Sequence, residues 1–474
     1  MLKKFVQMSL SDTYNEVIST IENDKPELLR LLEEHIDFEK LIPNTFYWVF
    51  HLRYGRPRDY GLEGFIRFFV LQRIIGVMCD KTFLAILRLS KELRDFCGFD
   101  KVPDASKITR FKQTFVKQLQ KVFENLVEIT EPICREIDAK KADYLIYDPT
   151  GIEAYVAENN PKFLNAKLSQ AKKAAKKNPD LNPYSLAYSL MPETAAANPL
   201  VKQQYINGHF CYAHKVGILT NGIGIVRDIA FFDEDFKRSH PEVVSKKTDN
   251  PELDKEIGDS TSLKPVLSDF FDKHPSFSYK TFLGDSSFDS YDAYAMLRND
   301  FGFERMCIPL NHRCSATAHS DFDVNGTPVC PIDKTPFTFL CESGGKNRSK
   351  RFKWVCHKSE RNGTSRFCTC EIPCTDSSYG RCVYTYPDKD LRLYPGIPRG
   401  TEHWDNLYRH RTLVERTIFL LKDPLGGACR KSFSQATAKA DLFLAGITQL
   451  IGVVLAKALN KPRLCKSVRK LVAA

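Results

Sequence analysis

Through the first 135 residues the apolar positions recur at helical spacing, and beyond them short apolar runs and turns take over. The first part therefore predicts an all-helical domain, and the second part predicts a sheet with helices. The helical pattern is expected to break at Pro26 and to break or kink at Pro132, because proline lacks the amide hydrogen that continues a helix. The helices expected here cover residues 12–36, 62–73, 81–96 and 117–137.

One more helix is expected to begin at Asp104 or Ser106, both of which are suitable N-cap residues. Short helices, a turn and then a basic polar helix are typical of a helix-turn-helix DNA reader. The alternative is a plain helical bundle with a charged surface. The side chains expected to face outward, toward DNA in the first case, are Lys107, Arg110 and either Lys112 or Gln113.

Two strands of the same design follow, each ending in an aspartate. Four apolar or aromatic residues precede Asp148, where an Asp-Pro-Thr-Gly turn signal begins, and residues 279–283 lead to Asp285. Sites in sheets flanked by helices favour such strand ends, although Asp148 also suits an Asx-turn. Asp289 and Asp292 are rival carboxylates, and we prefer Asp285 because it closes a strand as Asp148 does.

Between these strands, Asn221-Gly222 predicts a hairpin that joins residues 215–220 to residues 224–232. The lysine-rich residues 161–177 contain no acidic side chain and predict a mobile surface arm, either a solvated linker or a phosphate-binding segment. Further helices are expected at residues 262–273 and 290–299, and a strand at 304–309.

Residues 311–400 lose the helical periodicity and are rich in Gly, Pro, Ser, Thr and Cys. Nine of the 15 cysteines lie from Cys307 to Cys382, and crowded cysteines in a reducing compartment favour thiolate zinc binding, although no CxxC pair is present. The alternative is a β-rich structural domain without metal. The candidate zinc ligands are Cys330, Cys356, Cys370 and Cys374.

Residues 406–423 contain neither Gly nor Pro and predict a helix. Tyr408, Arg411, Glu415 and Lys422 fall within an arc of roughly 60° on one face, which suits a metal held beside a phosphate. The alternative is a solvated face with an i, i+4 pair between Arg411 and Glu415. A packing helix is expected at residues 439–459, followed by a basic tail, 461–470, that is frayed or faces DNA.

The 474-residue chain is 43% hydrophobic and 27% charged, which is typical of a soluble protein of several domains. Its formal net charge of +11 favours a polyanionic partner. The most apolar run, residues 442–456, is shorter than the ~20 residues that span a bilayer, so we expect a buried helix and no membrane partner. Scattered cysteines without a secretory signal pattern favour the reducing cytoplasm.

Asp148, Asp285 and Glu415 place three carboxylates on three elements. The order of strands and helices fits a mixed sheet of ribonuclease-H type, in which the first and fourth strands are neighbours. Three carboxylates supply the hard oxygen ligands that two Mg²⁺ ions need. Two metals about 3.5–4 Å apart stabilise the attacking and leaving oxygens of phosphoryl transfer.

These residues resemble bacterial insertion-sequence transposases of the DDE type, in the branch with a Tyr-x2-Arg-x3-Glu-x6-Lys signature. Tyr408, Arg411, Glu415 and Lys422 match that signature, and the stretches around Asp148 and Asp285 look like the two acidic motifs. The resemblance implies catalytic Asp148, Asp285 and Glu415 holding Mg²⁺ or Mn²⁺, with the other three residues on DNA. It also implies double-stranded DNA partners (terminal inverted repeats and target DNA), a homodimer on DNA, and a bacterial, nucleoid-associated location.

We therefore expect an α/β fold: a ribonuclease-H-like mixed sheet flanked by helices, an N-terminal all-helical domain, and a β-rich, cysteine-containing insertion before the last catalytic helix. The expected function is cutting and joining of DNA at insertion-sequence ends by two-metal-ion phosphoryl transfer. The alternatives are a host nuclease with the same core and a non-catalytic or domesticated DNA-binding protein. The expected domains are residues 1–135 (helical, DNA-binding), 136–310 (first part of the core), 311–400 (insertion) and 401–474 (second part and basic tail).

Overall fold

In the computed structural model the described residues are 11, 26–51, 57–178, 180–206, 209–243, 257–311, 321–345, 348–387, 389–429 and 434–472. The chain divides into two compact units, Met1–Ile133 with Leu421–Ala474, and Cys134–Leu420. Residues 401–474, expected to belong to one domain, are thus divided after Leu420, because the apolar C-terminal helix forms part of the core of the first unit. Most of the helix expected at residues 12–36 lies outside the described residues.

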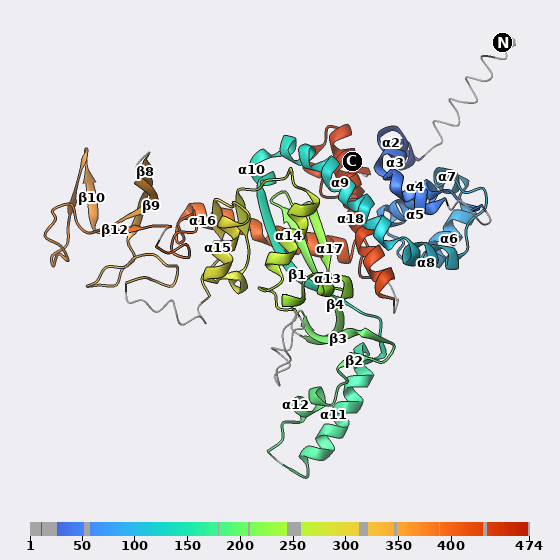
Figure 1. The fold of residues 1–474 in the computed structure, drawn as a ribbon, viewed down its shortest axis with the longest axis horizontal. Coiled ribbons are helices and arrows are strands. Elements are labelled where there is room, and N and C mark those ends of the chain that lie inside the picture. Colours follow the sequence, from blue (N-terminus) through green and yellow to red (C-terminus); the bar gives the residue numbers. More distant parts are fainter. Residues whose placement is uncertain are drawn as a thin grey trace, which may run out of the picture. The chain divides into compact units, whose positions relative to one another are not determined.

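Among its described residues, the regular elements of the first unit are all helices (Figure 1). Its helices are α2 (Glu27–His35), α3 (Phe38–Leu41), α4 (Asn44–Phe50), α5 (Leu62–Ile75), α6 (Asp80–Leu89), α7 (Lys91–Phe96), α8 (Ala105–Thr114), α18 (Gln435–Ala458), α19 (Val468–Val472) and most of α9 (Val116–Ile137). The helix expected at residues 81–96 is two helices, because the Ser90 hydroxyl accepts a hydrogen bond from the Leu93 amide and starts α7.

The core helix of this unit is α18, which packs against α2, α5 and α8. It is long and apolar enough to cross a membrane, but 83% of its most apolar stretch is buried inside the structure. The segment expected as a frayed or DNA-facing tail is not frayed, because residues Val468–Val472 fold back on α18 as α19, with Val468 and Leu471 buried. The burial of these two apolar side chains therefore determines where the basic segment packs, because it outweighs the solvation of the lysines beside them.

A charged cluster lies inside the same helical unit. Arg73 and Asp441 form an ion pair of 2.8 Å with both side chains fully buried. The Lys112 ammonium lies 3.3 Å from Asp441 and 3.2 Å from Asp80. Lys112, an alternative to Gln113 for the outward face of α8, therefore points inward, where each charge is balanced by an opposite one. Gln113 is the exposed member of that pair.

The second unit is built on a seven-stranded mixed sheet with the order β2-β3-β4-β1-β6-β7, and β5 pairs with β4. β1 is parallel to β6, and β6 is parallel to β7, whereas β4 is antiparallel to β1, β3 and β5. The hairpin expected at Asn221-Gly222 joins β4 to β5. The strands are β1 (Tyr144–Glu153), β2 (Thr194–Ala195), β3 (Asn198–Ile206), β4 (His209–Asn221), β5 (Val226–Phe231), β6 (Thr281–Leu283) and β7 (Arg305–Cys307).

Helices flank this sheet, with α14 over one face and α17 over the opposite face (Figure 1). Residues 161–177, expected as a mobile arm, form the helix α11. Asn160 caps it by accepting a hydrogen bond from the Lys162 amide, and Pro161 occupies its first position. The helices are α10 (Ala139–Ala142), α11 (Pro161–Ala175), α12 (Pro183–Ser189), α13 (Glu234–Ser239), α14 (Leu263–Lys273), α15 (Tyr291–Asn299), α16 (Glu402–Tyr408) and α17 (Thr412–Lys422).

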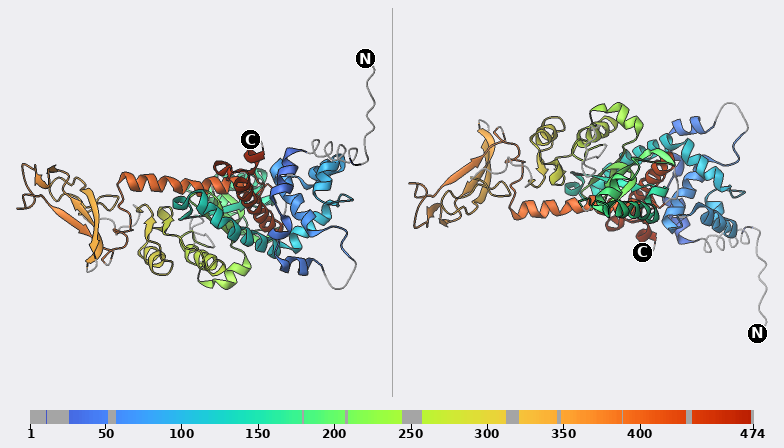
Figure 2. Two further views of the ribbon diagram at one scale, coloured as in Figure 1. Left: turned by 90° about the horizontal axis from the view of Figure 1, so that it is seen from above. Right: turned by 90° about the horizontal axis from the view of Figure 1, so that it is seen from below.

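Between β7 and α16 the chain forms two small antiparallel sheets, β12-β9-β8 and β10-β11. The chain then returns to the large sheet, where the Met306 amide donates to the Pro395 carbonyl oxygen (2.7 Å). Figure 2 shows α16 and α17 following one another as a single rod. The strands of the insertion are β8 (Thr338–Gly345), β9 (Arg348–Val355), β10 (Ser359–Asn362), β11 (Ser365–Cys368) and β12 (Cys382–Thr385).

Candidate active site

Asp148 lies in β1, and Asp285 lies two residues beyond the end of the neighbouring strand β6, at the same level. β1 and β6 are parallel and in register, and their last pair is Ile146 with Leu283. Two residues further along each chain come Asp148 and Asp285. Because side chains alternate with a period of two, both carboxylates continue the face of that last pair. The pairing of β1 with β6, 137 residues later in the chain, thus brings the two acidic motifs together.

Asp148 lies within β1 and does not begin a turn, which corrects the expectation from Asp-Pro-Thr-Gly. β1 continues to Glu153 by antiparallel pairing with β4, with Asp148 opposite Ile218 and Pro149 opposite Gly217. β6 has already ended at this level, so β1 has a partner on one side only, and a proline without an amide hydrogen is tolerated there. Long-range pairing with β4 therefore overrides the local turn signal.

The preceding residue shows which face Asp148 occupies. Tyr147 is fully buried, and its hydroxyl group hydrogen-bonds with the Ser262 hydroxyl (2.7 Å), immediately before α14. Asp148 then points to the opposite face, on which α17 lies. The sheet therefore separates a packed face under α14 from an acidic face under α17.

Glu415 is held on that acidic face by the packing of α17. Val414 is fully buried, and the Thr417 hydroxyl donates to the Gly224 carbonyl oxygen (3.0 Å) in the turn between β4 and β5. The helix expected over residues 406–423 is interrupted by a 3₁₀ turn at Arg409–Arg411. The four-residue step from Arg411 to Glu415 keeps the two side chains on the same side of the helix.

The guanidinium of Arg411 lies among the three carboxylates. Its Nη2 atom is 3.6 Å from Asp148 Oδ1 and 3.7 Å from Asp285 Oδ2, and its Nη1 atom donates to Glu415 Oε1. The i, i+4 pair proposed as the alternative thus exists, but the same arginine also contacts both aspartates. Sequence positions 148, 285 and 415 are therefore brought to one place, with a single cation between them.

The surroundings of Asp148, which include the carboxyl groups of Asp285 and Glu415, disfavour a negative charge on Asp148. Burial raises the pKa of Asp148 to about 7; the nearby Arg411 lowers it, and Asp285 and Glu415 raise it further. The Asp148 side chain is 19% exposed, whereas Glu415 is 49% exposed. An additional positive charge at this position would favour the ionised form of Asp148.

Tyr408 and Lys422, the outer members of the four-residue signature, lie at either end of this region. The half-buried Tyr408 ring stacks on Trp404, with centroids 4.8 Å apart. Burial is the largest cause that raises the pKa of Tyr408, and Asp285 and Glu415 add to it. Lys422 is the last residue of α17, roughly 10 Å along the helix axis from Glu415.

Asp289, one of the rival carboxylates, is occupied by a different arginine. Arg392 binds it through Nε (2.8 Å) and Nη2 (2.5 Å), and the Asn311 amide donates to the same carboxylate (2.6 Å). The other rival, Asp292, is exposed in the first turn of α15. Sequence reasoning did not single out Arg392, because no local pattern marks an arginine whose partner lies 103 residues away.

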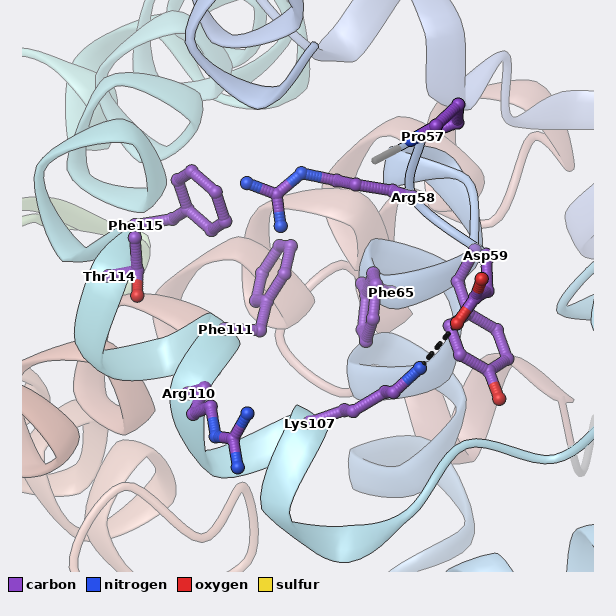
Figure 3. Close-up of a pocket in the computed structure, with 10 residues that line it drawn as sticks. Pro57, Arg58, Asp59, Phe65, Lys107, Arg110, Phe111, Thr114 and Phe115 are labelled. Carbon is purple, nitrogen blue, oxygen red and sulfur yellow. Dashed lines mark hydrogen bonds and ion pairs between the residues drawn. The ribbon is translucent and has the colours of Figure 1, made fainter. Parts of the chain in front are cut away.

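In the helical unit, the two candidate DNA contacts of α8 border a cavity of about 360 Å³ (Figure 3). Lys107 forms an ion pair with Asp59 (2.7 Å), and Arg110 is exposed. The expected N-cap is Asp104, which accepts a hydrogen bond from the Ser106 amide (2.8 Å). Lys107 is therefore partly engaged within the unit, whereas Arg110 is directed to solvent.

The four candidate zinc ligands lie in the insertion, where Cys330 and Cys356 are buried and Cys370 and Cys374 pack against them. In the part of the chain that the structure describes, no group of three or more His, Cys, Asp or Glu side chains has the geometry of a metal site. At the acidic face the guanidinium of Arg411 lies among the three carboxylates.

Comparisons with known proteins gave one family-model match and a structural similarity. No curated protein matches the chain. Among solved structures, a cryo-EM structure of a piggyBac transposase synaptic complex with hairpin DNA is similar over 95% of this chain and 79% of that chain, with 10% identity and a TM-score of 0.39. Residues 17–114 match the model of a family described as a transposase domain (DUF772), and this match supports a transposase as the class of protein.

Proposed function

We propose that the chain is a DDE transposase that cuts and joins DNA at the ends of an insertion sequence. The observation that carries this proposal is the convergence of Asp148, Asp285 and Glu415 around Arg411. The transposase-domain match over residues 17–114 and the net charge of +11 support it. The strand order β5-β4-β1-β6-β7, in which β4 alone runs antiparallel to the other four strands, supports a ribonuclease-H-like core.

The proposed cofactor is Mg²⁺ or Mn²⁺, held by Asp148, Asp285 and Glu415. Carboxylate oxygens are the ligands that these hard cations prefer, so the donor set fits. When bound, the metal would activate a water molecule or a 3′-hydroxyl and neutralise the departing oxygen. Arg411 lies among the three carboxylates, so it has to move aside or share their oxygens when the cation binds.

Arg411 is also suited to hold the scissile phosphate. Among the described residues, its Nε atom is buried and has no hydrogen-bond partner. An arginine with a free N–H group beside carboxylates can donate to a phosphate oxygen while its other nitrogen atoms remain paired. We assign Arg411 the role of orienting the phosphate, and Tyr408 and Lys422 the neighbouring DNA contacts along the same rod of helix.

The proposed partner is double-stranded DNA: the terminal inverted repeats and the target. Lys107 and Arg110 of α8 are the proposed phosphate contacts of the helical unit, with Arg110 the more available. A homodimer on paired ends and a nucleoid-associated cytoplasmic location complete the proposal.

The test is a cleavage and joining assay with the purified full chain and duplexes copied from the DNA that borders its coding sequence. We expect cleavage with Mg²⁺ or Mn²⁺, none with EDTA, and joining of the cut ends to a plasmid. Glu415→Gln should abolish cleavage and keep the gel shift, whereas Asp292→Asn, at an exposed carboxylate, should behave as the wild type. Cleavage without joining would favour a host nuclease, and a metal-independent gel shift without cleavage would favour a DNA-binding regulator.

A further inference from the structure

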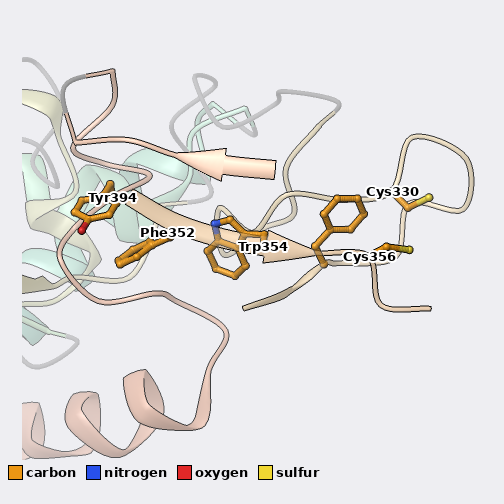
Figure 4. Packing of buried hydrophobic residues seen from close by; sticks show 6 residues of the cluster. Cys330, Phe352, Trp354, Cys356 and Tyr394 are labelled. Carbon is orange, nitrogen blue, oxygen red and sulfur yellow. The ribbon is translucent and has the colours of Figure 1, made fainter. Parts of the chain in front are cut away.

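The β-rich insertion has a small apolar core. Two of the six buried residues in its cluster are cysteines, and they lie beside each other at one end of the cluster (Figure 4). Sheets of two and three strands bury little apolar surface, and such modules are commonly stabilised by disulfides or a structural metal. The members of this insertion core are Cys330, Phe337, Phe352, Trp354, Cys356 and Tyr394.

Five thiols from three segments of the chain lie in or beside the insertion core. Cys370 and Cys374 pack against the core. Cys368 and Cys356 both border Gly380, where an added Cβ would lie 3.4 Å from the Cβ of Cys368 and 3.6 Å from the Cβ of Cys356. The neighbouring Cys368 thiol is the largest cause that raises the pKa of Cys370. All five are free thiols. Segments separated by up to 44 residues of sequence thus converge, and cysteines lie beside the aromatic side chains where they meet.

The backbone holds the first two of these cysteines at tight turns. The Cys330 carbonyl oxygen accepts from the Lys334 amide (3.0 Å), and Lys334 has a left-handed φ of 58° that closes the turn. The Cys356 amide donates to Arg381 (3.0 Å), and its carbonyl oxygen accepts from Ser359 (2.9 Å). These hydrogen bonds fix the Cα positions, so only side-chain rotation is left to arrange the sulfur atoms.

A soft divalent metal explains this gathering better than a disulfide. A disulfide joins two sulfur atoms and leaves three thiols crowded together. Zn²⁺ takes four thiolates in a tetrahedral site, and its charge balances sulfur atoms that would otherwise repel one another when ionised. Metal binding then supplies the stability that the small apolar core lacks.

We propose that the insertion binds one zinc ion through Cys330, Cys356, Cys370 and Cys374. Cys368 lies near Cys356 beside Gly380, outside this ligand set. In the described ranges no group of three His, Cys, Asp or Glu side chains already has the geometry of a metal site. The thiols must therefore rotate about their Cα–Cβ bonds to bind zinc. The proposal is independent of the acidic face, since none of these cysteines belongs to it.

The test measures zinc in the full chain, purified without chelators or metal-affinity resin, by plasma mass spectrometry. We expect about one zinc ion per chain, as for a four-thiolate site. Cys330→Ser and Cys374→Ser should lose most of this zinc. Cys341→Ser, at an exposed cysteine of β8, and Cys368→Ser should keep it.

Cobalt gives a second measurement that does not depend on the folding of the variants. Wild-type protein stripped of metal and titrated with Co²⁺ should develop a thiolate-to-cobalt charge-transfer band, which added Zn²⁺ should abolish. Reduced wild-type protein that takes up neither Zn²⁺ nor Co²⁺ would overturn the proposal. Full zinc content in Cys330→Ser and Cys374→Ser, or loss of zinc in Cys368→Ser, would overturn the ligand set. DNA cleavage is not measured, so either outcome leaves the proposed function to its own test.

Discussion

Asp285 and Asp289 lie four residues apart, and each faces an arginine, but the two pairs are built differently. Asp289 is fully buried and receives hydrogen bonds from Arg392, Asn311 and Tyr294. The Asp285 side chain is 37% exposed, and its Oδ2 atom lies 3.7 Å from Arg411, beyond hydrogen-bonding distance. One carboxylate has its acceptor sites filled by protein, whereas the other keeps an oxygen available.

Asp289 and Arg392 therefore form a structural ion pair, whereas Asp285 beside Arg411 can still bind a ligand. Burial works to raise the pKa of Asp289, but the hydrogen bonds from Arg392 and Asn311 outweigh it and hold that pKa below its usual value. A carboxylate so fully bound has no lone pair left for a metal. Asp285 is bound on one oxygen only, by the Ser287 amide and hydroxyl. Proximity to an arginine therefore does not by itself mark a catalytic carboxylate.

The largest expected effect is on catalysis and comes from Asp285→Asn. Removing one charge from the acidic face should lower the rate of DNA cleavage by about 10²–10³-fold or more, because the charge that stabilises phosphoryl transfer is lost. Its free energy of unfolding should stay within about 0.5 kcal/mol of the wild type, since the side chain is partly exposed. Cleavage kinetics and urea unfolding of the same preparation check both values. Wild-type cleavage by this variant would remove Asp285 from the site.

The reverse result is expected for the structural pair. Asp289→Asn or Arg392→Ala should lower the free energy of unfolding by about 3–5 kcal/mol, because each leaves a buried charge without its partner. Thermal and urea unfolding measure the loss. The double variant Asp289→Leu with Arg392→Met should cost less than the sum of the two single changes. If the single variants were as stable as the wild type, the ion pair between Asp289 and Arg392 would not stabilise the fold.

A buried histidine extends the comparison to a group with no ionic partner. Burial lowers the pKa of His214 to about 4, and its Nδ1 atom has no hydrogen-bond partner among the described residues. The unfolded chain binds a proton near pH 6.5, so stability should fall as the pH drops from about 6.5 toward 4. The loss from this residue is at most roughly 3 kcal/mol.

Urea unfolding of wild type and His214→Phe at pH 7.5 and pH 4.5 checks this expectation. The difference in stability between the two pH values should be smaller in His214→Phe, because Phe binds no proton. An equal difference in both proteins would show that other groups account for the acid sensitivity.

The smallest expected effect concerns DNA affinity. Lys422→Ala should weaken binding to a cut DNA end by about fivefold to tenfold, and should reduce the slope of log affinity against log salt by about 1. Fluorescence anisotropy at several salt concentrations measures both. Lys140→Ala, at an exposed lysine of α10, serves as the control. Equal losses of DNA affinity in the two variants would show that Lys422 acts through the overall positive charge of the protein and does not contact the DNA end.

Local sequence signals located much of the acidic face but not its geometry. The strand before Asp285 and the helix that carries Glu415 follow from apolar spacing and the absence of Gly and Pro. The turn expected at Asp148 is absent, because pairing with β4 supplies hydrogen bonds that a local turn cannot match. The lysines of residues 161–177 are good helix formers, so α11 forms once Asn160 caps it.

The sequence by itself determined most of the helical and extended segments, because spacing, caps and turn residues act over a few positions. The turn expected at Asp148 and the arm expected at residues 161–177 are the exceptions. It also determined which reactive side chains are present: three carboxylates, the residues around Glu415, and the thiols of the insertion. Only the tertiary structure decided which charges meet. Arg411 lies among Asp148, Asp285 and Glu415, Arg392 takes Asp289 from 103 residues away, and Lys112 is buried against Asp441 from 329 residues away. Such pairs depend on strand order and helix packing, and these have no signature within the neighbouring residues.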